Sequence, residues 1–484
     1  MDSQSVKNIV KLLGIIGLCI SLFFLIPILV GIFYHEDVFF FTIFDIFFFI
    51  INFLIFITLR KHRINLSIRD GILSVNLVWI LVGFAGAVPL WLYGKITFMQ
   101  GIFESISGFT TTGATIFADI ENLPHMILIL RSLMHWVGGL GILVFGVGLL
   151  SLINPSGSLT LFKAESSGIR VDKTTPKIKD TSLMLWGIYL VLTVVDAVLL
   201  KLGGMTSFDA FNHALSTIST GGFSTKDLSL AAYSDSGFIL WTTTIFMILS
   251  GITFIAHLRM IHGDFNGYKN EETKWYIIIF IVLSIFLTCS RYCSSDDSFY
   301  FSLTHATFSI ASLMTTTGFA SVDYETWGPM AVSLSFLAML ASGNGGSTAG
   351  GVKIIRYVIS FKVIFAELEK ILHPKAIVRV FINDSPVSNS IITLTFGFII
   401  LFVITNSILI FYLYESGHDM MTSVSASMAC IGNIGPGFAA VGPSHNYSIF
   451  SSIDLLALSF GMILGRLEIF TFLLMFIPSF WKRF

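Results

Sequence analysis

The chain has 484 residues, of which 54% are hydrophobic and only 12% are charged. Soluble proteins carry about 25% charged residues, so the composition excludes an ordinary soluble domain and indicates an all-α, polytopic membrane protein. The formal net charge of −1 argues against nucleic acid as a partner.

A helix that crosses a bilayer needs about 20 mostly apolar residues, and ten segments of the chain meet this requirement. They are 9–32, 39–59, 72–93, 124–152, 182–201, 237–258, 275–291, 327–360, 389–414 and 449–480. The first segment is too long for the core of a signal peptide, and no small-residue cleavage site follows it, so we expect it to be retained. The first two segments form an N-terminal hairpin, residues 1–70.

Lysine and arginine set the expected orientation, because cytoplasmic loops of membrane proteins are enriched in both. With both termini in the cytoplasm, all but six of the 28 fall in cytoplasmic segments. The exceptions are Lys95, Lys201, Lys226 and Arg291 outside, and Arg131 and Arg466 within spans. The outer segments are acidic instead, which would either concentrate cations at an outer mouth or simply ease translocation of these loops.

A short phrase rich in threonine and glycine recurs on the outer side, between pairs of spans. Its copies are Thr110-Thr111-Thr112-Gly113, Ser219-Thr220-Gly221-Gly222, Thr315-Thr316-Thr317-Gly318 and, in degenerate form, Cys430-Ile431-Gly432-Asn433. Each follows a segment too short to cross a bilayer, which we expect to be a half-helix over 97–109, 206–218, 299–314 or 418–429.

Aligning Gly432 with Gly113, Gly222 and Gly318 predicts four copies of one unit, since internal repetition at a steady spacing indicates a repeat architecture. Each unit is a span, a half-helix, a loop and a second span. We expect four such pore repeats, over residues 71–165, 166–265, 266–375 and 376–484.

The four phrases suit a cation filter. Non-helical backbone at membrane depth is tolerated where it lines water or is buried in protein, and a ring of carbonyls can replace the hydration shell of a cation. The expected ligands of the cation are the backbone carbonyls of Thr111, Thr112, Thr220, Gly221, Thr316, Thr317, Ile431 and Gly432. One such phrase could be an ordinary polar turn, but its recurrence on one side of the membrane favours a filter.

The eighth apolar segment is interrupted by the string Gly343-Asn344-Gly345-Gly346-Ser347-Thr348-Ala349-Gly350-Gly351. Its glycines permit large backbone changes, and it would lie just below the filter. A phosphate-binding loop is disfavoured because Gly351 and Val352 stand where Lys and Ser or Thr are needed. Close helix packing through small residues is the other alternative.

Arg466 lies within the last span, where a charge is costly and usually functional. A structural ion pair with Glu468 is the alternative to a role in the ion path. Arg131 and His135 are one helical turn apart, and both could meet Glu104, for which we expect a structural role.

These features together resemble the Trk/Ktr/HKT superfamily of potassium and sodium transporters. The N-terminal hairpin, the sequence Gly432-Asn433-Ile434-Gly435-Pro436-Gly437 and the sequence Gly465-Arg466-Leu467-Glu468 are most similar to the membrane subunits of bacterial Trk potassium uptake systems. The resemblance implies a homodimer in the bacterial inner membrane with one pore per subunit. It also implies a cytosolic, nucleotide-binding TrkA-type ring as regulatory partner.

The resemblance further implies that residues 343–351 form an intramembrane loop that obstructs the pore, and that Arg466 projects into the pore beneath the filter. A serine in the first repeat is associated with sodium transport in some plant relatives, whereas Gly113 stands there in this chain. Potassium is therefore the expected ion, and no tightly bound cofactor is expected.

Two functions remain open. The first is gated, channel-like K+ uptake that also passes Rb+, and the second is K+ symport coupled to H+ or Na+. Coupling usually needs carboxylates at membrane depth, and few are visible besides Glu104, Asp454 and Glu468, which favours the channel.

An enzyme is remote, because the spans contain no H-E-x-x-H or G-x-S-x-G motif. The chain has no sizeable soluble domain, so control by a nucleotide would need a partner. The basic loops 154–180 and 353–379 are the expected docking faces, although a positive-inside bias alone would also explain their charge.

Overall fold

The computed structural model describes residues 3–153 and 178–481, and within them the regular secondary structure is almost entirely helical. The exception is a short antiparallel hairpin of β1 (Phe381–Ile382) and β2 (Ser385–Pro386). The predicted docking loop 154–180 lies mostly outside the described residues.

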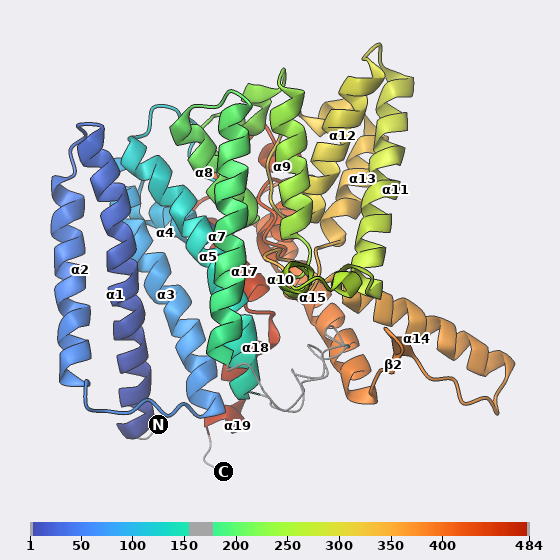
Figure 1. The fold of residues 1–484 in the computed structure, drawn as a ribbon, viewed down its shortest axis with the longest axis horizontal. Coiled ribbons are helices and arrows are strands. Elements are labelled where there is room, and N and C mark those ends of the chain that lie inside the picture. The colour runs from blue at the N-terminus through green and yellow to red at the C-terminus, as the bar shows by residue number, and fades with distance from the viewer. Residues whose placement is uncertain (1–2, 154–177, 482–484) are drawn as a thin grey trace.

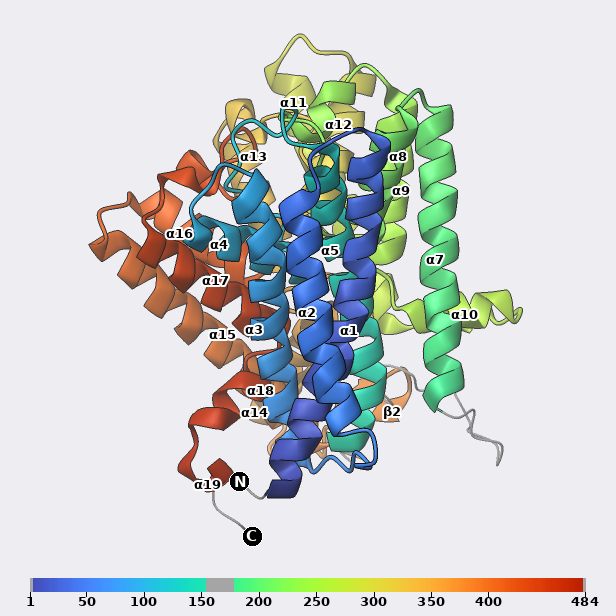
Figure 2. The ribbon, with the colours of Figure 1, turned by 90° about the vertical axis from the view of Figure 1, so that its left-hand side faces the viewer.

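The N-terminal hairpin consists of α1 (Ser3–Phe33) and α2 (Phe39–Thr58), which stand side by side at one edge of the bundle (Figures 1 and 2). Inside the pair, the Ser21 hydroxyl donates to Asp45 Oδ1 at 2.6 Å. Only Phe41, Asp45 and Asn52 of α2 are buried, so most of its phenylalanines face outward, as a membrane-facing helix requires.

The remaining helices follow in chain order. They are α3 (Ile68–Tyr93), α4 (Phe98–Phe109), α5 (His125–Ile153), α7 (Ile178–Leu202), α8 (Ser207–Ile218), α9 (Gly237–Ser250), α10 (Phe254–Ile261), α11 (Glu271–Ser294), α12 (Phe299–Met314), α13 (Pro329–Leu340), α14 (Ile354–Leu372), α15 (Asn389–Glu415), α16 (Met420–Ile431), α17 (Ser452–Arg466), α18 (Phe470–Leu473) and α19 (Pro478–Trp481). Short 3₁₀ turns lie at η1 (Ser229–Tyr233), η2 (Phe265–Tyr268), η3 (Tyr324–Trp327), η4 (Ala439–Val441), η5 (Tyr447–Ile449) and η6 (Leu474–Phe476).

Six helices of the described residues are long and apolar enough to cross a membrane, or eight when each of two bent pairs counts as one span. The predicted span 237–258 is wrong as a straight helix, because the chain turns by 96° between α9 and α10. The predicted span 449–480 likewise turns by 107° after α17, where Glu468 and Ile469 adopt positive φ angles of 55° and 44°. The predicted interruption of 327–360 is confirmed, since α13 ends at Leu340 and α14 begins at Ile354.

Four short helices, α4, α8, α12 and α16, are packed inside the bundle and correspond to the predicted half-helices. Each begins at a side chain that caps the helix by accepting a backbone N–H three residues on. The capping residues are Thr97, Thr206, Ser298 and Asp419. Each helix ends at one of the four recurring phrases, so its C-terminal partial negative charge is directed at that loop.

Candidate ion filter and gate

The four loops share one backbone pattern. An N–H in each loop donates to the carbonyl five residues earlier, and the residue before that donor has a positive φ. The bonds run from Thr112 to Ser107 (2.9 Å), Gly221 to Ser216 (2.8 Å), Thr317 to Ser312 (2.9 Å) and Ile434 to Ala429 (2.8 Å). The residues with positive φ are Thr111 (53°), Thr220 (53°), Thr316 (58°) and Asn433 (52°). The chain therefore leaves each short helix along the same path.

A left-handed glycine follows in every loop and packs against a carbonyl of the next loop. A Cβ added at Gly113 would lie 2.1 Å from the Gly221 oxygen, and one at Gly222 would lie 2.0 Å from the Thr317 oxygen. A Cβ added at Gly318 would lie 2.2 Å from the Ile434 carbonyl oxygen, and one added at Gly435 would lie 2.6 Å from the Thr112 carbonyl oxygen. The four loops thus close into a ring, first to second to third to fourth and back to the first.

The ring corrects the predicted register of the fourth loop. Gly432 is not the counterpart of Gly113, because Gly432 caps α16 in a right-handed conformation with φ −75°. The counterpart is Gly435, with φ +98°. Cys430 and Ile431 accordingly belong to the last turn of α16, and the carbonyls equivalent to those of Thr111 and Thr112 are those of Asn433 and Ile434. In the first three loops, the residues that correspond to Thr111, Thr112 and Gly113 in the structure are the ones that the sequence alignment paired.

Side chains behind the ring hold the loops in place. The hydroxyls of Thr110 and Thr112 lie 2.7 Å apart, and so do those of Thr315 and Thr317. The Asn433 amide donates to the Thr112 hydroxyl at 2.9 Å and to the Met462 carbonyl at 3.0 Å. Asn433 therefore ties the fourth loop to the first, a role that the sequence prediction missed.

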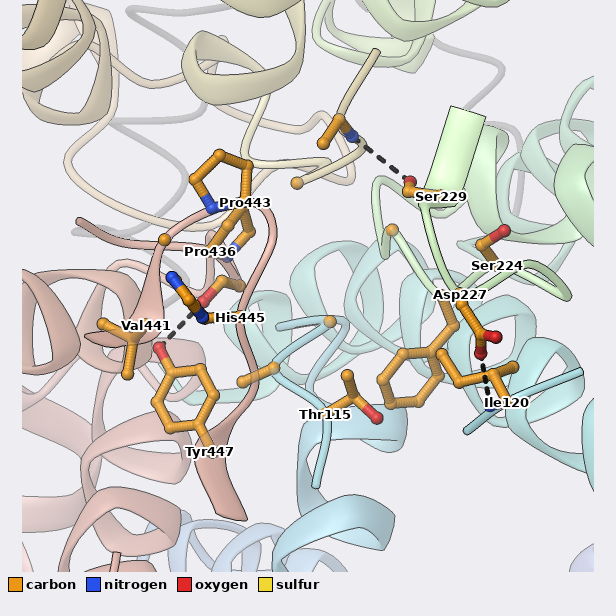
Figure 3. A pocket seen from close by; sticks show the side chains of 18 of the residues that line it. Thr115, Ile120, Ser224, Asp227, Ser229, Pro436, Val441, Pro443, His445 and Tyr447 are labelled. Carbon is orange, nitrogen blue, oxygen red and sulfur yellow. Dashed lines mark hydrogen bonds between the residues drawn. The ribbon is translucent and has the colours of Figure 1, made fainter. Parts of the chain in front are cut away.

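A small cavity of about 70 Å³ lies on the outer side of the ring and is lined by glycines from all four loops (Figure 3). Its rim is fixed by hydrogen bonds between distant segments. The Tyr447 hydroxyl donates to the Gly435 carbonyl at 2.8 Å, and Asp227 Oδ1 accepts the Ile120 N–H at 2.5 Å. This cavity is therefore a preformed opening on the outer side of the ring, through which an ion could reach the four loops.

Two residues of η3 position the segment that follows the fourth loop. The Tyr324 hydroxyl donates to the Gly437 carbonyl at 3.0 Å, and the Glu325 carboxylate accepts the Ala439 N–H at 2.9 Å. Partial burial raises the pKa of the Glu325 carboxyl above its ordinary value. No local pattern in the sequence predicts these contacts, because they join residues more than a hundred positions apart.

Glu104 of α4 and Arg131 of α5 form a fully buried ion pair, with Nε and Oε1 2.9 Å apart. Glu104 also accepts the Ile116 N–H at 2.8 Å, and Arg131 donates to the Ser224 carbonyl at 3.1 Å. The pair therefore links the segments that follow the first and second loops. The predicted contact of Glu104 with Arg131 is present, but His135 instead bonds the Gly108 carbonyl at 2.7 Å.

We expect Glu104→Gln to lower stability by about 3 kcal/mol, because removing one partner of a buried pair leaves the other charge uncompensated. The apparent melting temperature in detergent measures the effect. The matched control is Glu367→Gln, since Glu367 pairs with Lys370 at the surface, where side chains are 60% and 41% exposed. Such a pair contributes about 1 kcal/mol or less. Equal shifts for the two variants would contradict the prediction.

The glycine-rich string 343–351 lies directly beneath the ring and touches the ends of the short helices. The Gly350 N–H donates to the Thr316 hydroxyl at 2.7 Å, and the Thr348 hydroxyl donates to the Ile218 carbonyl at 3.1 Å. A Cβ added at Gly350 would lie 2.6 Å from the Gly432 oxygen. The string therefore contacts the second, third and fourth quarters of the ring.

Two groups of residues hold the string from below. The Asn344 N–H donates to the Gly251 carbonyl at 2.8 Å, and the Phe254 N–H donates to the Gly346 carbonyl at 3.1 Å, both at the break between α9 and α10. Buried Glu272, in the first turn of α11, accepts the Gly345 N–H at 2.7 Å. Glu272 was not among the predicted site residues, although a carboxylate beside an apolar run is visible in the sequence.

Arg466 lies at the end of α17 and is 4% exposed. Its Nη1 donates to the Thr348 carbonyl at 3.0 Å, and its Nη2 donates to the Gly138 carbonyl at 3.3 Å. Glu468 does not pair with Arg466 and instead accepts from Arg356 at 2.8 Å. The arginine therefore bridges the glycine-rich string to α5, beneath the first quarter of the ring.

Comparison with known proteins gives consistent results. The family described as "TrkH: Cation transport protein" matches residues 38–483. The Trk system potassium uptake protein TrkH of Halomonas elongata is 32% identical over 490 residues, covering 99% of this chain and 100% of that protein. The Trk system potassium uptake protein TrkG of Escherichia coli is 32% identical over 488 residues, with both chains covered in full. The crystal structure of the potassium transporter TrkH from Vibrio parahaemolyticus matches with a TM-score of 0.90 at 30% identity, covering 99% of this chain and 100% of that one.

Proposed function

Because this chain belongs to the TrkH family of cation transport proteins, we propose that it takes up potassium through one channel-like pore. The pore passes through the ring of four loops, and the pore repeats are residues 71–165, 166–265, 266–375 and 376–484. The observation that carries the proposal is the closed ring itself, in which equivalent carbonyls of Thr112, Gly221, Thr317 and Ile434 recur at one level. A ring of carbonyls is the chemistry that replaces the hydration shell of K+.

The glycine-rich string and Arg466 act as the gate in this proposal. The string is buried against three quarters of the ring, and Arg466 adds a positive charge beneath it. A cation leaving the filter meets both a folded backbone and an unfavourable charge. Glycines at positions 346 and 351 have positive φ angles of 72° and 64°, which lets this backbone rearrange without side-chain clashes.

Coupled symport is the second candidate, and one carboxylate favours it. Asp196 is fully buried in α7, and no salt bridge among the described residues includes it. Unpaired acids at membrane depth are typical of proton relays. The other deep carboxylates are engaged in contacts that order the protein, Glu104 with Arg131 and Glu272 with the Gly345 N–H.

The test is uptake of radioactive rubidium into liposomes that hold the purified protein and a potassium gradient. We expect uptake without any imposed H+ or Na+ gradient, strong competition by K+ and weak competition by Na+, with Gly113→Ser losing that preference. Asp196→Asn should leave the initial rate unchanged. If uptake requires a proton gradient and Asp196→Asn abolishes it, the symport proposal replaces the channel.

The assembly belongs to the same proposal. We propose a homodimer in the bacterial inner membrane, with both termini in the cytoplasm and a cytosolic TrkA-type ring as partner. The support is α14 and its neighbouring hairpin, which project from the bundle on the side of the termini (Figure 1). Phe365 and Leu372 of α14 are exposed apolar residues, and Ile377, between α14 and β1, is 87% exposed. Apolar surface of this kind marks an interaction site.

A further inference from the structure

A cavity of about 870 Å³ lies between α7 and α10. Figure 2 shows α10 lying crosswise to α7 at the flank of the bundle. Its lining is almost wholly apolar, with Gly187, Val191 and Leu192 from α7 facing Leu258 and Ile261 from α10. Val191 and Ile261 at its edge are 60% and 65% exposed, so the cavity is open laterally.

The few polar groups in the wall are already bonded within the protein. The His257 ring bonds the Tyr268 hydroxyl at 2.5 Å through Nδ1 and the Leu249 carbonyl at 2.9 Å through Nε2. These polar groups therefore do not need a polar ligand to complete their hydrogen bonds. An occupant gains chiefly by burying hydrocarbon.

The position of the cavity indicates which kind of hydrocarbon would occupy it. The segment Ser182–Leu202 of α7 is apolar and long enough to cross a membrane, and its side chains Val191, Val194 and Val198 face outward. The cavity is continuous with this surface and lies in the first half of α7, toward the side of the molecule that carries the termini (Figure 1).

We propose that this cavity binds an acyl chain of a membrane phospholipid. The apolar wall takes the chain, because the burial of hydrocarbon against apolar side chains stabilises the complex. The cavity opens onto the lipid-facing surface of α7, from which the chain enters. The site is distinct from the ring of loops and from the cavity on its outer side, since the two cavities share no residue.

The bound chain regulates the gate, a step that rests on the proposed function. The helix α10 begins at Phe254, whose N–H holds the Gly346 carbonyl at 3.1 Å, and a Cβ at Gly346 would lie 3.0 Å from the Thr253 hydroxyl. An occupant that fills the space between α7 and α10 keeps α10 in place. The glycine-rich string is thereby held beneath the ring.

Gly187→Trp tests the binding site without disturbing the helix, because a Cβ at Gly187 has no neighbour within 4 Å. The indole occupies the part of the cavity beside α7 and displaces the chain from it. The matched control is Val194→Trp, on the same side of α7 but outside the cavity. The probe is palmitoyl-oleoyl phosphatidylglycerol, added to delipidated full-length protein and counted by native mass spectrometry.

We expect wild type and Val194→Trp to retain one phospholipid that Gly187→Trp binds at least about tenfold more weakly, a loss of about 1.4 kcal/mol. Equal lipid occupancy in all three proteins would overturn the proposal. A change of oligomeric state in Gly187→Trp, with lipid binding unaltered, would assign the cavity to a protein interface instead and would also overturn it.

Rubidium flux into liposomes tests the coupling separately. Loss of the bound chain should raise the flux of Gly187→Trp severalfold, because the chain holds α10 and the glycine-rich string in place, and should leave Val194→Trp at the wild-type rate. Weaker lipid binding with unchanged flux would refute the coupling between the bound chain and the gate, but it would still support the lipid-binding site. Absence of flux in the wild type would refute the proposed function, whereas the lipid count would still decide whether the site exists.

Discussion

Gly222→Ala will abolish rubidium uptake, reducing it to the rate of protein-free liposomes. The added Cβ would lie 2.0 Å from the Thr317 carbonyl oxygen, a contact that real Cβ atoms do not make. The neighbouring backbone cannot yield easily, because the Thr317 N–H is bonded to Ser312 and its hydroxyl to Thr315. The second loop must therefore move away from the third, and the ring opens.

Backbone strain alone does not account for this effect, and Gly204→Ala provides the control. Gly204 lies in the turn between α7 and α8 with φ +108°, and a Cβ there has no neighbour within 4 Å. Both variants carry the cost of a left-handed alanine, about 1–2 kcal/mol, but only Gly222→Ala meets a carbonyl. Uptake in Gly204→Ala should equal wild type. Normal uptake in Gly222→Ala, with folding confirmed by size-exclusion chromatography, would disprove a filter at this ring.

Arg466→Ala will raise rubidium flux by about tenfold or more. A positive charge within about 8 Å of the ion path contributes about 2 kcal/mol to the barrier at an effective dielectric constant near 20, and 1.4 kcal/mol corresponds to tenfold in rate. The substitution also removes the bonds to the Thr348 and Gly138 carbonyls, which hold the glycine-rich string in place. Deleting Gly345–Gly351 should change flux in the same direction.

Arg466→Gln separates the two contributions, because glutamine keeps an N–H donor for the Thr348 carbonyl but carries no charge. We expect its flux to lie near that of Arg466→Ala, since the charge provides most of the barrier. Flux in Arg466→Gln at the wild-type level would assign the barrier to the hydrogen bonds. Wild-type flux in both Arg466 variants and in the deletion would contradict the gate altogether.

The short helices and three of the loops were predictable from local signals. A capping side chain such as Thr97 marks where each helix begins, and the Thr-Gly phrases mark where three of them end. The fourth loop was misaligned because Gly432 matched by residue type. Its φ of −75° requires no glycine, whereas Gly435 does, and only backbone angles distinguish the two.

The bends and long-range ties could not be predicted. Hydropathy reports that 237–258 is apolar but carries no information on direction, so the 96° turn at Gly251–Thr253 was missed. That turn exists because the Gly251 carbonyl and the Phe254 N–H are used by the glycine-rich string, almost a hundred residues away. The bonds from Asn433 to Thr112 and from Glu272 to Gly345 join equally distant positions and leave no local pattern.

The closure of the ring also has a consequence for biosynthesis. The bond from Asn433 to Thr112 joins residues 321 positions apart, so the last quarter must be synthesised before the first quarter gains its second neighbour. Until then the chain in the membrane carries an open arc of three loops, and contacts at such separation form late. A nascent chain therefore has no closed ring of four loops through which ions could leak. A chain terminated before Gly435 would lack the contact that closes the ring, however well its earlier helices inserted.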